Sequence, residues 1–260
     1  MRVGDNPASL LYVSKKLEKA ETIGINAREV HLPDNTTQDN LKQLIEELNN
    51  DPKTNGILIQ LPLPKQLISN QITSCVNHLK DVDGLSPYNV GALATNLDGL
   101  IPCTPLACTI LLHSRIKDLS GMHAVIIGKS NLVGRPLGQL LMHEECTVTN
   151  VHKLTKNISD ITKQADIIIA AAGSPGLVKA DWVKDGAYVI DVGITNVNGK
   201  IKGDVDFDSV VDKVTAITPV PGGVGPMTVA CLMLNTVKAT CLQHNIEPQF
   251  ITVEMLRDLH

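Results

Sequence analysis

Two hydrophobic periodicities alternate along the chain, and they divide it into short predicted helices and strands. In the first half, apolar residues at helical spacing follow helix-capping residues, whereas unbroken apolar runs end in polar residues. This pattern predicts helices at 7–23, 37–50 and 65–78, strands at 28–32 and 56–60, and an irregular stretch at 89–105.

The second half shows the same alternation more regularly. A helix at 106–114 leads into predicted strands at 123–128, 147–151, 166–171, 187–192 and 215–218, and a loop at 221–226 precedes a long helix from Met227. Strands that alternate with helices are typical of α/β proteins with parallel sheets. Because the last helix is expected to pack back on the first half, we predict one domain at 1–106 plus 227–260 and another at 107–226.

Composition narrows the possible functions. The net charge of -4 provides no basic surface for nucleic acid, and the sequence has no run of about 18 apolar residues that would predict a membrane span. The six cysteines form no C-x-x-C pair and no His cluster accompanies them, so neither a disulfide scaffold nor a metal site is expected. Unpaired thiols favour a reducing compartment, which we expect to be the cytoplasm.

A glycine-containing turn follows the predicted strand at 123–128, and an apolar helix follows the turn. This order is typical of a Rossmann phosphate site, where glycine allows close approach to a pyrophosphate and the helix N-terminus favours negative charge. Ser130 replaces the middle glycine of G-x-G-x-x-G, and an ordinary turn is the alternative interpretation. The candidate cofactor-binding residues are Gly128, Lys129, Ser130, Val133, Gly134 and Pro136.

The end of the next strand indicates which dinucleotide binds. NAD sites usually place a carboxylate there to hold the ribose hydroxyls, but this strand ends in the sequence Asn-Val-His and then Lys153. The positive charge favours the 2′-phosphate of NADP, with Lys129 as a second partner, although a solvated lysine edge is the alternative. Gly173 and Gly193, the latter followed by Ile194, end later strands, where they would admit a nicotinamide ribose or simply form tight turns.

Four residues of the first half are candidates for catalysis or substrate binding. Tyr12 and Lys16 are four apart on the first helix, so they share a face. Gln60 ends a buried strand, and Asp83 lies in a loop before glycine. Each also has an ordinary explanation, because helical lysines are mostly solvated, Asp before Gly is common in turns, and an amide can satisfy backbone groups.

Five motifs, in order along the chain, resemble those of a known enzyme family. They are Pro7-Ala8-Ser9-x-x-Tyr12-Val13-x-x-Lys16, Gln60-Leu61-Pro62-Leu63-Pro64, Asp81-Val82-Asp83-Gly84, Gly128-x-Ser130-x-x-Val133-Gly134-x-Pro136, and Pro219-Val220-Pro221-Gly222-Gly223-Val224-Gly225-Pro226-Met227-Thr228. Together they cover nearly the whole chain and are similar to the bifunctional methylenetetrahydrofolate dehydrogenase/methenyltetrahydrofolate cyclohydrolase family. Five ordered motifs are far more specific than one glycine turn.

The resemblance implies two α/β lobes that flank a cleft, the second being a Rossmann-like domain that binds NADP, with NAD the less expected cofactor. Tetrahydrofolate derivatives would bind in the cleft, with Tyr12 against the folate ring system and Asp83 hydrogen-bonded to the pterin edge. Lys16 would be the principal catalytic residue of the hydrolytic step, oriented by Gln60, with Asp83 also part of the catalytic set. The residues that would help to wall the cleft include Pro221, Gly222 and Gly223.

The implied reaction oxidises 5,10-methylenetetrahydrofolate to 5,10-methenyltetrahydrofolate with NADP⁺ and hydrolyses the product to 10-formyltetrahydrofolate. A lysine with a lowered pKa suits the proton transfers of the hydrolytic step, and no metal is required. The family forms homodimers through its cofactor domains, and we expect the same here, in one-carbon metabolism that serves purine biosynthesis.

Two features differ from the family pattern. Members usually have a further helix and strand before the segment that matches Arg2-Val3-Gly4. In addition, Lys153 stands where the family usually has a serine that contacts the 2′-phosphate. Two alternatives follow: a folate- or nucleotide-binding protein whose shortened start impairs turnover, and an NADP oxidoreductase that acts on another substrate.

Overall fold

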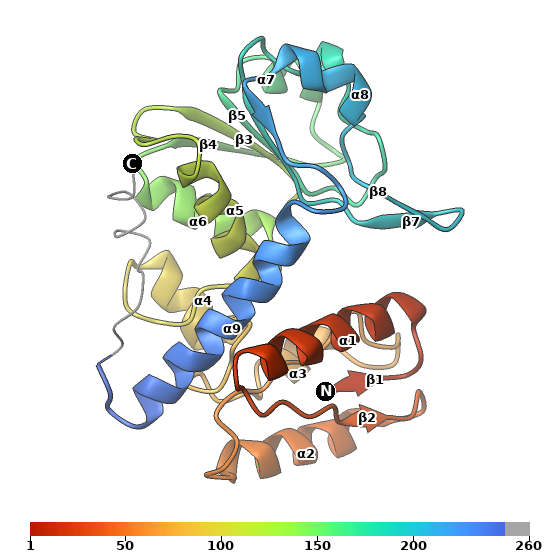
Figure 1. Ribbon diagram of the computed structural model, residues 1–260, viewed down its shortest axis with the longest axis vertical. Coiled ribbons are helices and arrows are strands. Elements are labelled where there is room, and N and C mark those ends of the chain that lie inside the picture. The colour runs from red at the N-terminus through yellow and green to blue at the C-terminus, as the bar shows by residue number, and fades with distance from the viewer. Residues whose placement is uncertain (248–260) are drawn as a thin grey trace. The chain divides into compact units, whose positions relative to one another are not determined.

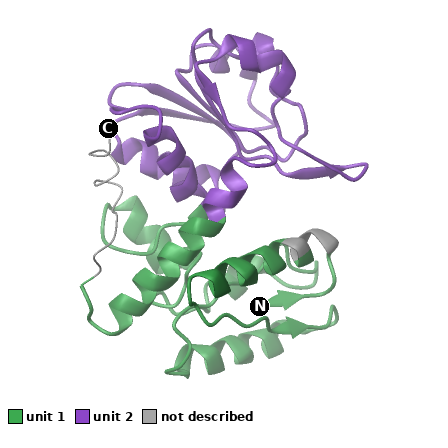
Figure 2. Cartoon of the chain, in the orientation of Figure 1, with its two compact units in different colours: residues 1–103, 229–248 green, residues 104–228, 249–260 purple. Residues whose placement is uncertain are grey.

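The computed structural model describes residues 1–247 of the chain. They form two compact units (Figure 2), of which unit 1 comprises 1–103 and 229–247, and unit 2 comprises 104–228. The chain passes from one unit to the other inside two helices, α5 (Cys103–His113) and α9 (Val224–Gln243). The α/β fold class predicted from the sequence is confirmed.

Unit 1 contains a small set of parallel strands. β1 (Arg2–Val3) pairs in parallel with β2 (His31–Leu32). On the other side of β1, the backbone nitrogen of Met1 donates to the carbonyl oxygen of Leu58 at 2.7 Å, and the nitrogen of Gln60 donates to the oxygen of Met1 at 2.9 Å. Gln60 is therefore held at the end of a strand-like segment beside β1.

The strands predicted in the first half are longer than those observed. The segment predicted at 56–60 is extended and forms an isolated parallel bridge between Ile57 and Asp81 besides its two hydrogen bonds to Met1, but it is not a regular strand. The strand predicted at 28–32 is shortened to the two residues of β2. The buried apolar side chains that hold this region together are Val3, Leu41, Ile45, Leu48, Ile57, Ile59, Leu67, Ile72 and Val76.

The helices of unit 1 correct two predictions from the sequence. They are α1 (Pro7–Thr22), α2 (Gln38–Asn50), α3 (Ser69–Thr73), α4 (Pro87–Ala94) and most of α9 (Figure 1). The helix predicted at 65–78 is wrong, because only α3 is helical there. The irregular stretch predicted at 89–105 is also wrong, since it contains most of α4, which begins where the Ser86 side chain accepts a hydrogen bond from the nitrogen of Asn89 and Pro87 takes the first position.

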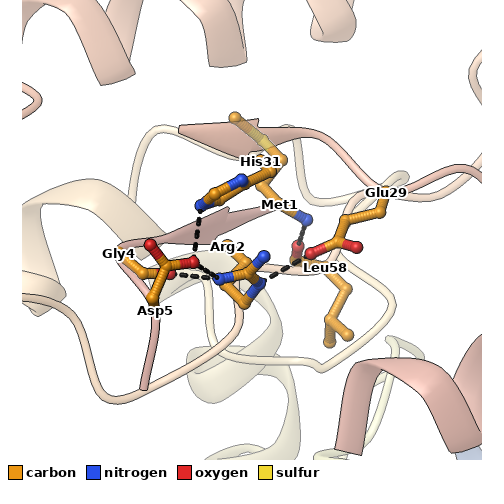
Figure 3. Close-up of polar contacts among 7 residues, drawn as sticks. All are labelled: Met1, Arg2, Gly4, Asp5, Glu29, His31 and Leu58. Atoms are coloured by element: carbon orange, nitrogen blue, oxygen red, sulfur yellow. Dashed lines mark hydrogen bonds and ion pairs between the residues drawn. The ribbon is translucent and has the colours of Figure 1, made fainter. Parts of the chain in front are cut away.

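A buried arginine fixes the chain between β1 and α1 (Figure 3). The guanidinium of Arg2 donates to Glu29 at 2.6 Å, to Asp5 at 3.0 Å and to the carbonyl oxygen of Gly4. The His31 Nε2 lies 3.3 Å from the same Asp5 oxygen that accepts from Arg2. These contacts set where α1 begins, and α1 bears the candidate residues Tyr12 and Lys16, which lie further along the helix.

Unit 2 is built around one five-stranded parallel sheet with the order β4-β3-β5-β6-β9. The strands are β3 (His123–Ile127), β4 (Thr147–Val151), β5 (Ile167–Ala170), β6 (Tyr188–Asp191) and β9 (Ala216–Ile217). All five correspond to strands predicted from the sequence, and β4 has the predicted bounds. Parallel strands with helices on both faces explain the unbroken apolar runs of β3 and β5, whose buried residues have no solvent-facing side.

Short helices and one hairpin complete unit 2. In Figure 1, α6 (Gly134–His143) lies on one side of the sheet, while α7 (Ile158–Thr162) and α8 (Phe207–Val210) lie on the other. The hairpin β7 (Thr195–Val197) and β8 (Lys200–Lys202) projects from the sheet. The loop predicted at 221–226 is too long, because α9 already begins at Val224.

Candidate functional site

Lys16 and Gln60 meet in unit 1, although they are 44 residues apart. The Lys16 Nζ donates to the Gln60 Oε1 at 2.9 Å, and both side chains are half-buried. The Gln60 Nε2 donates in turn to the carbonyl oxygen of Leu61 at 2.8 Å, which orients the amide so that its oxygen faces the lysine. The amide occupies one hydrogen-bonding direction of the lysine nitrogen and leaves its other directions for a substrate or a water molecule.

The charge on Lys16 is set by two opposing effects. Burial lowers its pKa below the ordinary lysine value, and the nearby carboxylate of Asp83 limits that shift. Burial also raises the pKa of Asp83 to about 6, opposed by the positive charge of Lys16 and by hydrogen bonding to Cys103. Burial thus moves both pKa values toward neutral pH, where proton transfer is needed, and the opposite charges of Lys16 and Asp83 limit the two shifts.

A network of buried polar groups holds the loop that bears Asp83. The Asp81 carboxylate accepts hydrogen bonds from the Ser86 nitrogen at 2.7 Å and from the Asn89 Nδ2 at 2.9 Å. Gly84 has a φ of +65°, and a Cβ there would come within 2.6 Å of the Leu100 carbonyl oxygen. Only glycine fits both conditions, so the Asp-Gly pair reflects the backbone as well as the chemistry.

Two residues of this site were missed by the sequence analysis. The buried thiol of Cys103 donates to the carbonyl oxygen of Val82 at 3.3 Å, and burial raises its pKa well above the ordinary value, so it stays a neutral donor. Asn235, from α9, donates to the carbonyl oxygens of Val82 at 2.9 Å and Ile101 at 2.7 Å. No local sequence pattern predicts these contacts, because Asn235 lies 153 residues after Val82.

Tyr12 lies one helical turn before Lys16 on α1 and is half-buried. Burial raises its pKa, so its phenol is neutral near pH 7. The apolar ring and the neutral hydroxyl therefore suit contact with a flat aromatic ligand.

The turn after β3 in unit 2 is shaped for close approach of a ligand. A Cβ at Gly128 would overlap the carbonyl oxygen of Ala171, and a Cβ at Gly134 would overlap the carbonyl oxygen of Gly128. The Asn150 Nδ2 donates to the carbonyl oxygens of Gly128 and Gly134, at 3.3 Å each, and so joins both ends of the turn to β4. These constraints support the Rossmann interpretation over an ordinary turn.

The polar side chains of the turn are placed where a phosphate could reach them. The Ser130 Oγ accepts a hydrogen bond from the Val133 nitrogen at 3.1 Å, close to the start of α6. Lys129 and Ser130 are exposed, as is Lys153 after β4, whereas Pro136 is buried in α6. The residues present fit a dinucleotide, with the glycines for the pyrophosphate and exposed lysines for an added phosphate.

The other candidate residues lie at the carboxyl ends of strands in unit 2. Gly173 has a φ of +65° after β5, Gly193 packs against Asp204 with no space for a Cβ, and Ile194 is 41% exposed. Pro221, Gly222 and Gly223 follow β9, where Gly222 has a φ of +111°. Gly222 and Gly223 line a cavity of about 610 Å³ within unit 2 together with residues of α5, β6 and β9.

The described part of the chain shows neither a metal-binding cluster nor a membrane-spanning helix. Residues 1–247 contain no group of three or more His, Cys, Asp or Glu side chains arranged to hold a metal ion. Over the same residues, no helix combines the length and the hydropathy needed to cross a lipid bilayer.

The fold and these residues define a class: a two-unit α/β enzyme with a Rossmann-like dinucleotide-binding unit and a second unit that presents a partly buried lysine. The chain matches the tetrahydrofolate dehydrogenase/cyclohydrolase family over both of its parts, the catalytic domain at residues 1–83 and the NAD(P)-binding domain at residues 102–244. It belongs to this family.

Three similar proteins illustrate the extent of the match. Bifunctional protein FolD 1 of Rhizorhabdus wittichii is 50% identical over 250 residues, covering 94% of this chain and 84% of that one. The crystal structure of the Campylobacter jejuni bifunctional enzyme FolD is 49% identical with a TM-score of 0.90, covering 93% of this chain and 86% of that chain. The Trypanosoma brucei enzyme, complexed with NADP and an inhibitor, is 38% identical with a TM-score of 0.89, covering 94% and 86%.

Proposed function

We propose that this chain oxidises 5,10-methylenetetrahydrofolate to 5,10-methenyltetrahydrofolate with NADP⁺ and hydrolyses the product to 10-formyltetrahydrofolate. The observation that supports this most strongly is the 2.9 Å hydrogen bond between Lys16 and Gln60, beside a carboxylate that acts on the same amine. Membership of the family adds the expected substrate class and the second activity. If the chain were an NADP oxidoreductase for another substrate, the arrangement of Lys16, Gln60 and Asp83 in unit 1 would have no evident role.

The oxidative step requires alignment more than acid–base chemistry. A bound nicotinamide dinucleotide accepts a hydride from the carbon that bridges two folate nitrogens, and the nitrogen lone pairs stabilise the resulting cation. The protein therefore has to fix the distance and angle between donor and acceptor. In unit 2, we assign this task to the turn at 128–134 and to the strand ends that include Gly173 and Gly193.

The hydrolytic step requires proton transfers, and we assign them to Lys16. Water adds to the cationic carbon, and a base must take a proton from that water before the ring opens. Because the pKa of Lys16 is lowered by burial, more of the amine is neutral near pH 7 than for an exposed lysine. Gln60 holds the amine in place, and Asp83, which remains close to Lys16, would accept a hydrogen bond from the pterin edge.

The expected assembly and compartment form part of the proposal. We propose a homodimer joined through unit 2, located in the cytoplasm, as the family resemblance and the unpaired cysteines lead us to expect. Light scattering after size-exclusion chromatography should give twice the chain mass of 28.0 kDa. A mass of one chain at micromolar concentration would contradict the dimer.

An absorbance assay tests the proposed reaction. The purified chain is mixed with methylenetetrahydrofolate and either NADP⁺ or NAD⁺, and the reduced cofactor and the methenyl compound are followed separately. We expect reduced cofactor to form with NADP⁺ and to form more slowly with NAD⁺. The methenyl compound should not accumulate lastingly. A folded sample that produces no reduced cofactor would instead support the alternative of a binding protein with impaired turnover.

A further inference from the structure

Asp204 is a fully buried aspartate of unit 2 whose partners are backbone N–H groups. Its carboxylate accepts hydrogen bonds from the nitrogens of Ala172, Gly173 and Ser174 at 2.6, 2.7 and 2.8 Å. Successive N–H groups that converge on one point form a nest, which in many proteins holds a phosphate or another anion. In this chain the anion in the nest is a side chain of the protein itself.

A second buried aspartate holds Asp204 in place. The Asp191 Oδ1 accepts from the Asp204 nitrogen at 2.8 Å and from the Gly193 nitrogen at 2.9 Å, and its Oδ2 accepts from the Val205 nitrogen at 2.9 Å. The backbone nitrogen of Asp191 donates to the Thr218 Oγ1 at 2.8 Å. The two carboxylates therefore join the carboxyl ends of β5 and β6 to the residues that follow β8, and the Thr218 hydroxyl links the end of β6 to the residue after β9.

The surrounding backbone is shaped around these carboxylates. A Cβ at Gly203 would overlap the Asp191 carboxylate, and a Cβ at Gly193 would overlap Asp204. Buried charges are costly unless they are fully hydrogen-bonded, so the backbone N–H groups at these strand ends are needed to stabilise the two carboxylates.

The nest determines which part of a dinucleotide can bind here. Its N–H groups are occupied by Asp204, so the loop at 172–174 cannot use them to hold the pyrophosphate, which is left to the turn at 128–134. β5 and β6 lie on the opposite side of β3 from β4. Since a dinucleotide extends along the carboxyl edge of such a sheet, and Lys153 follows β4, the ends of β5 and β6 are left to the nicotinamide half.

We infer that Asp204 is a positioning residue for the nicotinamide half of the cofactor. Its carboxylate fixes the loop at 172–174 in the conformation that receives the nicotinamide ribose, and Asp191 fixes Asp204. The inference rests on the proposed dinucleotide site. Asp204 is not among the candidate cofactor contacts, but it would determine the shape of one half of that site.

Calorimetric titration of the full chain with two probes tests the inference. The probes are NADP⁺ and adenosine 2′,5′-bisphosphate, which lacks the nicotinamide half. Asp204→Asn keeps the side-chain size but replaces one acceptor oxygen by a donor that faces N–H groups. We expect the Kd for NADP⁺ to rise about 10-fold, while the Kd for the bisphosphate changes by less than about twofold.

A matched variant and a second perturbation complete the design. Asp208→Asn removes the same charge from an exposed position four residues later and should leave both affinities unchanged. Gly173→Ala places a side chain at a φ of +65° in open space, which disturbs the loop without touching Asp204. It should weaken NADP⁺ binding about fivefold and again spare the bisphosphate, and it provides the test if Asp204→Asn does not fold.

The outcomes are distinct. Equal loss of both probes would mean that Asp204 only supports the fold of unit 2, and unchanged binding of NADP⁺ would mean that the loop does not receive the nicotinamide; either result overturns the inference. Failure of the unmodified chain to bind NADP⁺ would contradict the proposed function itself. Hydrolysis of the methenyl compound, which needs no dinucleotide, should persist in Asp204→Asn and confirms that the rest of the protein is intact.

Discussion

At the scale of single residues, the amine of Lys16 is under two opposing influences. Removal of water around it lowers its pKa, and the negative charge of Asp83 raises it. The hydrogen bond from Lys16 to Gln60 fixes where the amine lies, so its reactivity depends on both position and charge. The protonation state of one side chain should therefore respond to a change in its neighbour.

Replacing Asp83 by Asn should lower the pKa of Lys16 further. The substitution removes the charge that favours the protonated amine and leaves the dehydration in place. Heteronuclear NMR titration of the lysine Nζ signal measures this directly, and Glu18→Gln, an exposed change on the same helix, serves as the control. An unchanged or higher pKa of Lys16 in Asp83→Asn would show that the two groups are not coupled.

The pKa of Asp83 has its own consequence for stability. Because burial raises it to about 6 in the folded chain, Asp83 favours folding fully below about pH 4, and that contribution is lost as the pH rises through about 6. A buried carboxylate of this kind therefore costs stability at the pH where it is ionised.

Lys153→Glu should weaken the binding of NADP⁺ more than the binding of NAD⁺. The two cofactors differ by a 2′-phosphate, and a carboxylate in place of an ammonium repels that phosphate. We expect a loss of about 10-fold or more for NADP⁺ and a smaller loss for NAD⁺ in a fluorescence titration. Lys163→Glu, also exposed, is the charge-matched control. Equal losses of affinity for both cofactors would show that Lys153 does not contact the 2′-phosphate.

At the scale of elements, α2 illustrates how local sequence defines a helix. The Thr37 side chain accepts a hydrogen bond from the Asn40 nitrogen at 3.2 Å and so caps the first turn. Removing that cap with Thr37→Ala should lower the free energy of unfolding by about 1 kcal/mol. Urea denaturation measures the change, with the exposed Glu46→Ala on the same helix as a control. A loss no larger than that of the control would mean that packing alone sets this helix start.

Elements with strong local signals were predictable, and those governed by tertiary contacts were not. The alternation of strand-like and helix-like segments correctly predicted the five strands of unit 2, and the unbroken apolar runs of β3 and β5 reflect a sheet that is covered on both faces. The helix predicted at 65–78 failed because only five residues there are helical. The hairpin of β7 and β8 was overlooked although Asn198 and Gly199, with φ of +52° and +82°, are a typical signal for a tight turn.

The residues of the candidate site likewise fall into those that the sequence predicts and those that depend on distant contacts. Lys16 and Gln60 were found through motifs, and the structure brings them within hydrogen-bonding distance. Cys103 and Asn235 belong to the same unit, but their partners lie far away in the sequence, and no periodicity or spacing relates them. Asp204 was overlooked for a similar reason, since its importance depends on three N–H groups some 30 residues earlier.

For the molecule as a whole, the two proposed activities depend on different units, hydride transfer on the dinucleotide site of unit 2 and hydrolysis on Lys16 in unit 1. Gly128→Ala tests this division, because the new Cβ would overlap the carbonyl oxygen of Ala171 within the turn after β3. We expect NADP⁺ binding to fall by about 10-fold or more while hydrolysis of the methenyl compound stays within about twofold of the unmodified chain.

The control for Gly128→Ala is Gly121→Ala, which has a φ of +76° but open space around the new Cβ. It introduces backbone strain in unit 2 away from the turn and should leave NADP⁺ binding unchanged. Parallel loss of both activities in Gly128→Ala would contradict the division between the units.

The rate at which Lys16→Met hydrolyses methenyltetrahydrofolate tests the proposed role of this amine. The substitution keeps the length of the side chain but removes the amine, so hydrolysis should fall at least about 100-fold. Binding of NADP⁺ to the same sample should be unchanged, and the exposed neighbour Lys15→Met should hydrolyse normally. Hydrolysis by Lys16→Met at the unmodified rate would show that this amine does not perform the proton transfer.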